Sequence, residues 1–234
     1  MRRATTGAAF LLALLIAGVL PAMSATVVVP NVNTNTPGPS NQAFPFNTGD
    51  MRYQQVFAAN QLGGLVGPVT KIAYRVDENP DAGHPFTSNQ IDTEIRLCHT
   101  NAAPNAMSTT FANNLGGDVT LVFDGLLTLS SAGNPNLFDI VIDINDNFIY
   151  NGSQNLLVDI KVFNFAKTTQ FDSAGTAIGE GGTPWTDRVW AFGVNSAIGS
   201  SNGDDGMVTQ LTIEGATPVQ PTSWGKIKAT FQGR

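Results

Sequence analysis

The side chains that most often perform chemistry are scarce in this chain. It contains two histidines, His84 and His99, and one cysteine, Cys98. There is no HExxH pattern, and a single cysteine leaves no pair that would complete a zinc site. No serine lies in a G-x-S-x-G elbow, where a nucleophilic hydroxyl would be held for attack. The sequence therefore gives little support to the recognised hydrolytic or zinc-dependent chemistries.

A secreted hydrolase is the third and weakest of the functions that we consider. Sandwich-type glycosidases need two carboxylates that face each other across a cleft. Glutamate is rare here, and Glu94 lies in a predicted strand facing Arg96. Catalysis would require His84, in the loop DAGHPF, to converge with Glu180, in the loop GEGGTPW, and with nearby aspartates.

Two acidic stretches supply the oxygen ligands that calcium prefers on loops. They are DINDNF and SNGDDG, and their candidate ligands are Asp143, Asn145, Asp146, Asp204 and Asp205. Neither stretch has the spacing of a helix–loop–helix calcium site, and solvated acidic turns are the alternative interpretation. A structural calcium ion is the one cofactor that the sequence suggests.

Trp185 is the aromatic residue best placed to bind a sugar. It lies in the Gly- and Pro-containing loop GGTPWTD, where an exposed ring would stack on a sugar face. Trp190, in RVWAF, shares a strand face with Phe192 and Val194 and is interpreted as a core residue. A carbohydrate-binding module with Trp185 as its platform is therefore the second function; simple packing of the Trp185 loop is the alternative.

Cys98 lies in the alternating stretch TEIRLCHT. Alternation places Ile95, Leu97 and His99 on one face of a strand and Cys98 on the other, more polar face. Cys98 is interpreted as a packed small side chain, with an intermolecular disulfide as the alternative.

Period-two alternation recurs along the chain, which is typical of half-buried strands. Clusters of Gly, Asn, Asp, Ser and Pro separate these stretches and favour turns. Short strands without helical crossovers predict an all-β fold, a single antiparallel β-sandwich that is jelly-roll-like. The predicted strands are 26–29, 53–58, 71–76, 93–100, 119–123, 126–129, 138–145, 156–162, 169–172, 188–194 and 207–213.

The stretch STTFANNLGGDVTLVFDGLLTLSS, residues 108–131, has two halves. In the second half, Asp124-Gly125 separates two short apolar runs, a pattern that predicts a tight hairpin. The first half, Ser108–Leu115, carries no charged cluster and no histidine. We interpret it as a crossover between strands rather than as the rim of a binding site.

The N-terminal residues have the order of a secretory signal. Arg2 and Arg3 precede the apolar run Ala8–Leu20, and small residues follow Pro21. The run is too short for a comfortable membrane span, although an uncleaved anchor is the alternative. We therefore expect a signal peptide at 1–24, a sandwich domain at 25–215, and a Pro-containing linker with a short C-terminal tail at 216–234. The expected location is extracellular or on the cell surface, with no transmembrane segment after cleavage.

Charge excludes one class of partner. Lys and Arg total 12 of 234 residues and are scattered, so no basic stripe is available for a nucleic acid. Loss of Arg2 and Arg3 would take the net charge from −6 to about −8. The remaining length suits one large all-β domain, whose core needs no disulfide.

Several motifs together resemble one group of proteins. They are VPNVNTNTPGPSNQAFPF, MRYQQVFAANQL, GPVTKIAYRVD, LSSAGNPNLFDIVIDINDNFIYNGSQNLLVDIKVF and GMVTQLTI, which extend over 29–213. The set is similar to uncharacterised exported bacterial β-sandwich proteins of the PEP-CTERM-associated type. The resemblance implies export and a cell-surface or matrix role, and it supplies no catalytic residues. This chain ends in TSWGKIKATFQGR, without the PEP-CTERM tail, which favours free secretion or recognition of this other tail.

The first function is therefore a non-enzymatic exported protein with a structural or adhesive role at the cell surface or in the extracellular matrix. Its expected partners are other copies of itself or a surface polysaccharide. The stretch ATVVVP, residues 25–30, could add to the sheet edge of a neighbouring copy, but pairing within its own domain is favoured.

Overall fold

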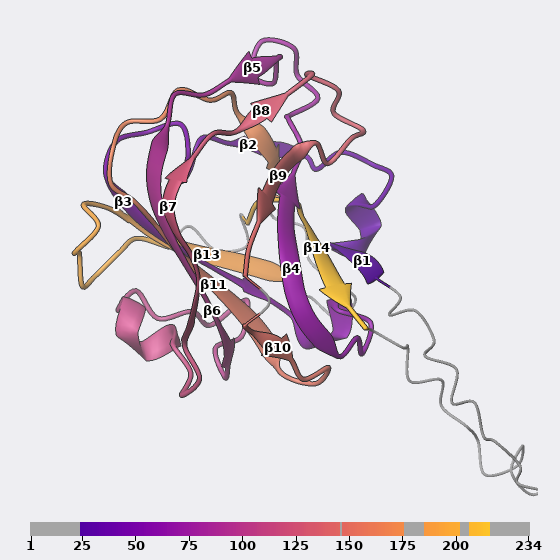
Figure 1. The fold of residues 1–234 in the computed structure, drawn as a ribbon, viewed down its shortest axis with the longest axis vertical. Coiled ribbons are helices and arrows are strands. Elements are labelled where there is room, and N and C mark those ends of the chain that lie inside the picture. Colours follow the sequence, from indigo (N-terminus) through magenta and orange to yellow (C-terminus); the bar gives the residue numbers. More distant parts are fainter. Residues whose placement is uncertain (1–23, 146, 176–184, 202–205, 216–234) are drawn as a thin grey trace, which may run out of the picture.

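The computed structural model describes residues 24–145, 147–175, 185–201 and 206–215 and is an all-β sandwich (Figure 1). One five-stranded sheet contains β1 (Ser24–Val29), β14 (Thr209–Glu214), β4 (Gly67–Tyr74) and β10 (Ile149–Tyr150), and β9 (Ile140–Asp143) also pairs with β4. The other, in order, contains β13 (Thr186–Phe192), β3 (Met51–Phe57), β11 (Asn155–Val162), β6 (Ile91–Thr100) and β7 (Thr120–Leu127). All of these pairings are antiparallel.

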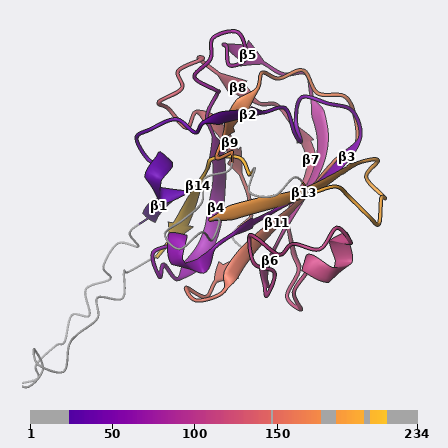
Figure 2. The ribbon, with the colours of Figure 1, turned by 180° about the vertical axis from the view of Figure 1, so that it is seen from behind.

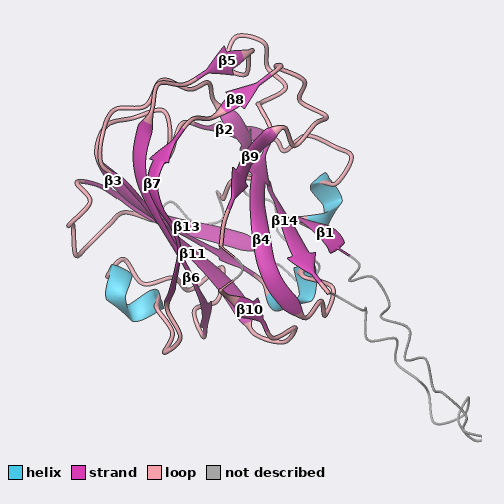
Figure 3. Ribbon diagram, in the orientation of Figure 1, coloured by secondary structure: helices cyan, strands magenta, loops and turns pink. Residues whose placement is uncertain are grey.

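Short elements complete the described fold. Two small sheets pair β12 (Phe171–Ser173) with β2 (Ser40–Gln42) and β5 (Phe86–Thr87) with β8 (Ser130–Ser131). The helical turns are the 3₁₀ helices η1 (Asn31–Asn33), η2 (Ala59–Gln61) and η3 (Phe111–Asn114), drawn in cyan in Figure 3. Within the described residues, no helix is both long and apolar enough to cross a membrane.

The strand order is that of a jelly roll. Eight strands form the sandwich, and in chain order they are β1, β3, β4, β6, β7, β9, β11 and β14. The first, eighth, third and sixth of these strands lie in one sheet. The second, seventh, fourth and fifth form the other sheet, which is the double Greek-key arrangement. β13 is an addition that pairs with the outer edge of β3. The predicted jelly-roll-like sandwich is therefore confirmed.

Alternating apolar residues fill the space between the two sheets, which face each other in Figures 1 and 2. In β11, every second residue points inward, and these side chains are fully or almost fully buried: Leu156, Val158, Ile160 and Val162. In β9, Ile140 and Ile142 are buried, whereas Val141 and Asp143 are exposed. In these two strands, the alternation seen in the sequence therefore matches the inward and outward positions of the side chains.

The outer face of the β13-containing sheet is also covered, which the sequence pattern did not indicate. Leu157 packs there with Val56 and Cys98 in a second, smaller apolar cluster. The loop that joins β6 to β7 lies over this cluster and contributes Met107 and Leu115. This loop carries η3, visible in pink at the lower left of Figure 1.

The hairpin predicted at Asp124-Gly125 is wrong. Residues 120–127 form one continuous strand, β7, that pairs with β6 along its length. Asp124 lies opposite Glu94 and Gly125 opposite Thr93, so both supposed turn residues are inside the ladder. Gly125 has a φ of 147°, which glycine tolerates without strain. Pairing with the ten-residue strand β6 therefore overrides the local preference of Asp-Gly for a turn.

A buried ion pair joins the end of β4 to β12. Arg75 Nε donates to Asp172 Oδ2 at 2.6 Å, and both side chains are 0% exposed. The amide of Gly38 also donates to Asp172, at 2.7 Å, and Arg75 Nη2 donates to the carbonyl of Thr36 at 2.7 Å. The guanidinium lies 4.7 Å from the ring centroid of Phe138. In the predicted strand 71–76, alternation puts Arg75 on the face opposite Ile72 and Tyr74, beside the polar Lys71, and the structure buries it there.

The first described strand pairs within its own domain. β1 runs antiparallel to β14, with Ser24 opposite Glu214 and Val29 opposite Thr209. Val28 and Val29 are buried. The favoured interpretation of this segment, pairing inside the domain, is therefore confirmed.

Candidate ligand-binding site

An open polar pocket of about 350 Å³ lies at one end of the sandwich, where β6 ends and the β6–β7 loop folds back. Residues 99–102, Asn113, residues 115–118 and Gln154 line it. They come from three segments: the end of β6, the β6–β7 loop and the turn between β10 and β11. This volume falls at the low end of the range for small-molecule sites, about 300–1,000 Å³.

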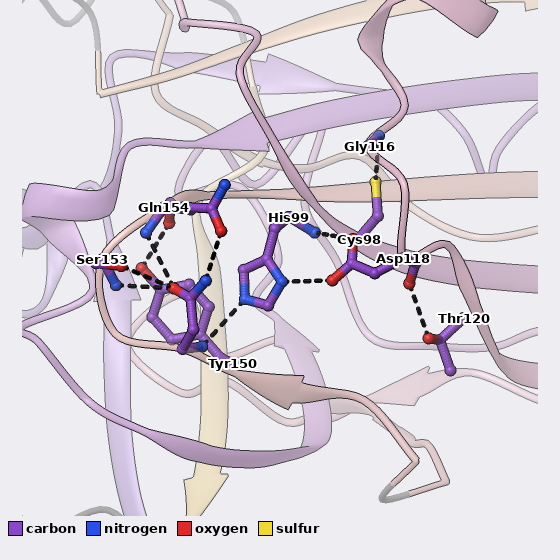
Figure 4. Close-up of polar contacts among 9 residues, drawn as sticks. Cys98, His99, Gly116, Asp118, Thr120, Tyr150, Ser153 and Gln154 are labelled. Carbon is purple, nitrogen blue, oxygen red and sulfur yellow. Dashed lines mark hydrogen bonds and ion pairs between the residues drawn. The ribbon is translucent and has the colours of Figure 1, made fainter.

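His99 is the centre of the hydrogen bonds in the pocket wall (Figure 4). Its Nδ1 lies 2.5 Å from Asp118 Oδ2, and its backbone amide donates to Asp118 Oδ1 at 3.0 Å. On the other side of the ring, the amide of Asn151 donates to Nε2 at 3.0 Å. Because a backbone N–H can only donate, Nε2 accepts and Nδ1 carries the proton. Both ring nitrogens are therefore occupied, and the ring is held as one neutral tautomer.

The His99 ring also joins the two sheets. It packs against Phe148 and Tyr150, with centroid separations of 4.9 and 5.6 Å. The Tyr150 hydroxyl donates to the carbonyl of Gln154 at 2.7 Å, and burial raises the pKa of this hydroxyl to about 12. His99 belongs to β6 of one sheet and Tyr150 to β10 of the other. This aromatic contact therefore fixes the position of the turn that carries Gln154.

The turn after β10 presents a side-chain amide to the pocket. Asn151 Oδ1 accepts bonds from the amides of Ser153 at 2.9 Å and Gln154 at 3.1 Å. Asn151 Nδ2 donates to Gln154 Oε1 at 2.6 Å. The side-chain oxygen of Gln154, Oε1, is therefore engaged, and its Nε2 donor lies on the other side of the side-chain amide (Figure 4).

Gly116 allows the loop to lie directly against β6. A Cβ on this residue would overlap the carbonyl oxygen of His99. Its amide donates to Cys98 Sγ at 3.4 Å. The neighbouring Gly117 has open space around it. Only glycine therefore fits at position 116, whereas Gly117 lines the pocket and has room for a side chain.

The arrangement suits binding rather than proton transfer. The Asp118 side chain is 48% exposed, and each of its carboxylate oxygens accepts one bond from His99. A carboxylate has about four acceptor positions, so Asp118 retains capacity for a ligand. His99 Nε2, by contrast, already accepts a bond from the backbone amide of Asn151.

Cys98 lies beneath the pocket wall. Its side chain is 1% exposed, and burial raises the pKa of its thiol to about 11. The β6–β7 loop would have to move away before this sulfur could reach a second chain. The structure thus places Cys98 as the packed small side chain of the first interpretation.

We expect Cys98 to react slowly with a thiol reagent in the native protein, because both burial and the raised pKa suppress the thiolate. Denaturation should release full reactivity. The measurement is the rate of modification by iodoacetamide with and without denaturant, followed by mass spectrometry. Equal rates in the two conditions would contradict the buried placement.

The other predicted site residues lie in several places. Trp185 is half-buried directly before β13, and its carbonyl accepts a bond from the amide of Ala58 at 3.0 Å. Trp190, interpreted as a core residue, is half-buried against the core, and its ring centroid lies 4.4 Å from that of Phe44. His84 Nδ1 lies 3.1 Å from the carbonyl of Pro85. His84 precedes β5, at the end of the sandwich opposite β10 (Figure 1).

The predicted calcium ligands are only partly described. Asp143 forms an exposed ion pair with Lys71, and the amide of Asn145 donates to the carbonyl of Val122. Among the described residues, no three His, Cys, Asp or Glu side chains group as a metal site. Asp146, Asp204 and Asp205, together with the candidate acid Glu180, lie outside the described residues. Calcium binding therefore stays a prediction.

The pocket was not predicted from the sequence. Ser108–Leu115, interpreted as a plain crossover, contributes Asn113 and Leu115 to its rim. The available signals were a histidine at a strand end and the Gly-Gly-Asp that follows the crossover. Neither signal indicated Gln154, which lies 36 residues after Asp118 in the sequence.

Comparison of the chain with known proteins finds no matching family model, curated protein or solved structure.

Proposed function

We propose that this protein is a non-enzymatic exported β-sandwich that works in adhesion at the cell surface or in the extracellular matrix, and that it adheres by binding carbohydrate. The observation that carries the proposal is the placement of two features at one end of one sheet. The polar pocket lies at the end of β6, and Trp185 lies at the start of β13.

The register of the strands puts these two features on a common edge. Asn155 of β11 lies opposite Thr100, and Thr186 of β13 lies opposite Phe57 of β3. β13 and β6 are three strand spacings apart, or roughly 14 Å at about 4.8 Å per spacing. A glycan chain that lies across the strand ends would span this separation. Its sugar rings could meet polar groups in the pocket and an aromatic ring at Trp185.

The state of His99 favours binding over hydrolysis. A general base needs a free lone pair within reach of the proton that it removes. The Nε2 lone pair of His99 accepts the Asn151 amide, and Nδ1 is directed at Asp118. Export is supported by the N-terminal signal pattern and by the resemblance to exported sandwich proteins.

The test is retention by insoluble polysaccharides. We expect the purified protein to be retained by at least one of cellulose, chitin, mannan or galactan, and to release no soluble reducing sugar from it. Trp185→Ala is expected to reduce retention, because the stacked ring is lost. Time-dependent sugar release would overturn the non-enzymatic assignment. Unchanged retention by Trp185→Ala would exclude Trp185 as a platform.

A further inference from the structure

We propose that the pocket at the end of β6 is a subsite for one neutral sugar residue, which would bond to the Asp118 carboxylate and to the amide side chains of Asn101 and Gln154. This inference rests on the proposed function and adds to it the position of the site and the chemical class of its ligand.

The pocket offers donors and acceptors in the combination that sugar hydroxyls require. A hydroxyl donates one hydrogen bond and accepts others, so it pairs best with an acceptor and a donor together. Asp118 is an exposed acceptor. Among the described residues, Asn101 makes no side-chain hydrogen bond, and Gln154 uses only its oxygen. These two amides therefore supply free donors beside the carboxylate.

The charge of the pocket selects against acidic sugars. Asp118 is the one charged side chain among the lining residues, because His99 is held as its neutral tautomer. A uronate or a sulfated sugar would bring a second negative charge beside Asp118, in a protein whose net charge is −6. Two N–H groups of His99 already bond to Asp118 and spread its charge. A neutral hydroxyl pair is therefore the better match than an anion.

The remaining wall suits the carbon face of a sugar ring. Leu115 and Ala102 contribute apolar surface, and Gly116 and Gly117 expose backbone without side chains. Binding sites for small ligands commonly combine apolar surface with a few well-placed polar groups. The fixed tautomer of His99 and the tight approach of Gly116 hold these groups in place before a ligand arrives. Such preorganisation reduces the entropy that binding costs.

Isothermal titration calorimetry with defined oligosaccharides tests the proposal. The probes are three neutral oligosaccharides, from mannan, galactan and cellulose, one anionic oligogalacturonate and one cationic chitosan oligomer. The variants are Asn101→Ala and Gln154→Ala. The matched control is Asn60→Ala, which removes an exposed amide at η2, outside the pocket lining.

We expect at least one neutral oligosaccharide to bind the wild-type protein and Asn60→Ala equally. Each pocket variant should weaken that binding about tenfold, as the loss of one hydrogen bond predicts. If a neutral oligosaccharide binds and neither pocket variant weakens its binding, this subsite is overturned, whereas carbohydrate adhesion is not. Binding of only the chitosan or only the galacturonate oligomer would overturn the neutral class. Failure of every glycan, both here and in the retention assay, would overturn the proposed function as well.

Discussion

Arg75→Ala is expected to lower the free energy of unfolding by about 3–5 kcal/mol, the usual cost of removing one partner of a buried ion pair. The substitution leaves the Asp172 carboxylate buried with the Gly38 amide as its remaining donor. It also removes one of the two hydrogen bonds to the carbonyl of Thr36, which keeps the Asn33 amide as a donor, and opens a cavity beside Phe138. Urea denaturation at pH 8, monitored by tryptophan fluorescence, measures the loss.

The matched control for this variant is Lys71→Ala, in the same segment of the chain. Lys71 pairs with Asp143 on the surface, where both side chains are largely exposed. Exposed pairs contribute about 0–1 kcal/mol, so this variant should unfold nearly as the wild type does. If the two variants lost the same stability, burial would not be the property that makes the Arg75 pair important.

The deficit of Arg75→Ala should also depend on pH. Burial already raises the pKa of Asp172 to about 6, against the opposing effect of Arg75, which lowers it. Without Arg75, the pKa of this carboxyl in the folded state rises further above its unfolded value of 3.8. The folded state then binds a proton that the unfolded chain has released, so stability falls as the pH rises through this interval. The deficit is therefore expected to be smaller at pH 5 than at pH 8.

Gly116→Ala is expected to disrupt the pocket and to lower the free energy of unfolding by about 1–3 kcal/mol, the range for overpacked sites. Its new Cβ would overlap the carbonyl oxygen of His99, which belongs to the backbone and cannot rotate away. The β6–β7 loop must therefore lift from β6. That movement would break the bond from the Gly116 amide to Cys98 and displace Asp118 from His99.

Gly117→Ala provides the control, because a Cβ there meets no atom within 4 Å. Two readouts report on the loop: thermal unfolding and the rate at which iodoacetamide modifies Cys98. We expect Gly116→Ala to unfold at a lower temperature and to expose Cys98, while Gly117→Ala leaves both unchanged. Equal behaviour of the two variants would show that contact between Gly116 and His99 does not hold the loop in place.

The sandwich could be predicted because its strands carry their own signal. Alternation in β9 and β11 identified the inward residues without knowledge of their partners. The Asp-Gly prediction failed for the opposite reason, since pairing of residues 120–127 is decided by a strand that lies elsewhere in the sequence. At these residues the local preference of Asp-Gly for a turn conflicts with long-range pairing to β6, and the pairing determines the structure.

Burial on the outer face was beyond the reach of alternation. Cys98 and Leu157 face outward as the pattern predicts, yet an irregular loop covers them. Nothing periodic marks a loop that folds back onto a sheet. The pocket is harder still to predict, because His99, Asp118 and Gln154 come from three separate segments that meet only in the folded structure. Sequence reasoning selected Trp185 on composition and missed the polar residues at the same sheet end.

The pairing of β1 with β14 determines how the molecule would respond to tension. Ser24 lies opposite Glu214, so whatever is attached before the first strand and after the last leaves from one corner of the sandwich. A pull on both attachments would separate β1 from β14 progressively, breaking the hydrogen bonds between them one after another from Ser24. The proposed glycan pocket lies at this same end, because Tyr150, which stacks on His99, pairs with Gly67 beside Glu214. A pull between one attachment and a ligand in the pocket would therefore load neighbouring strand ends and not the full length of the sandwich.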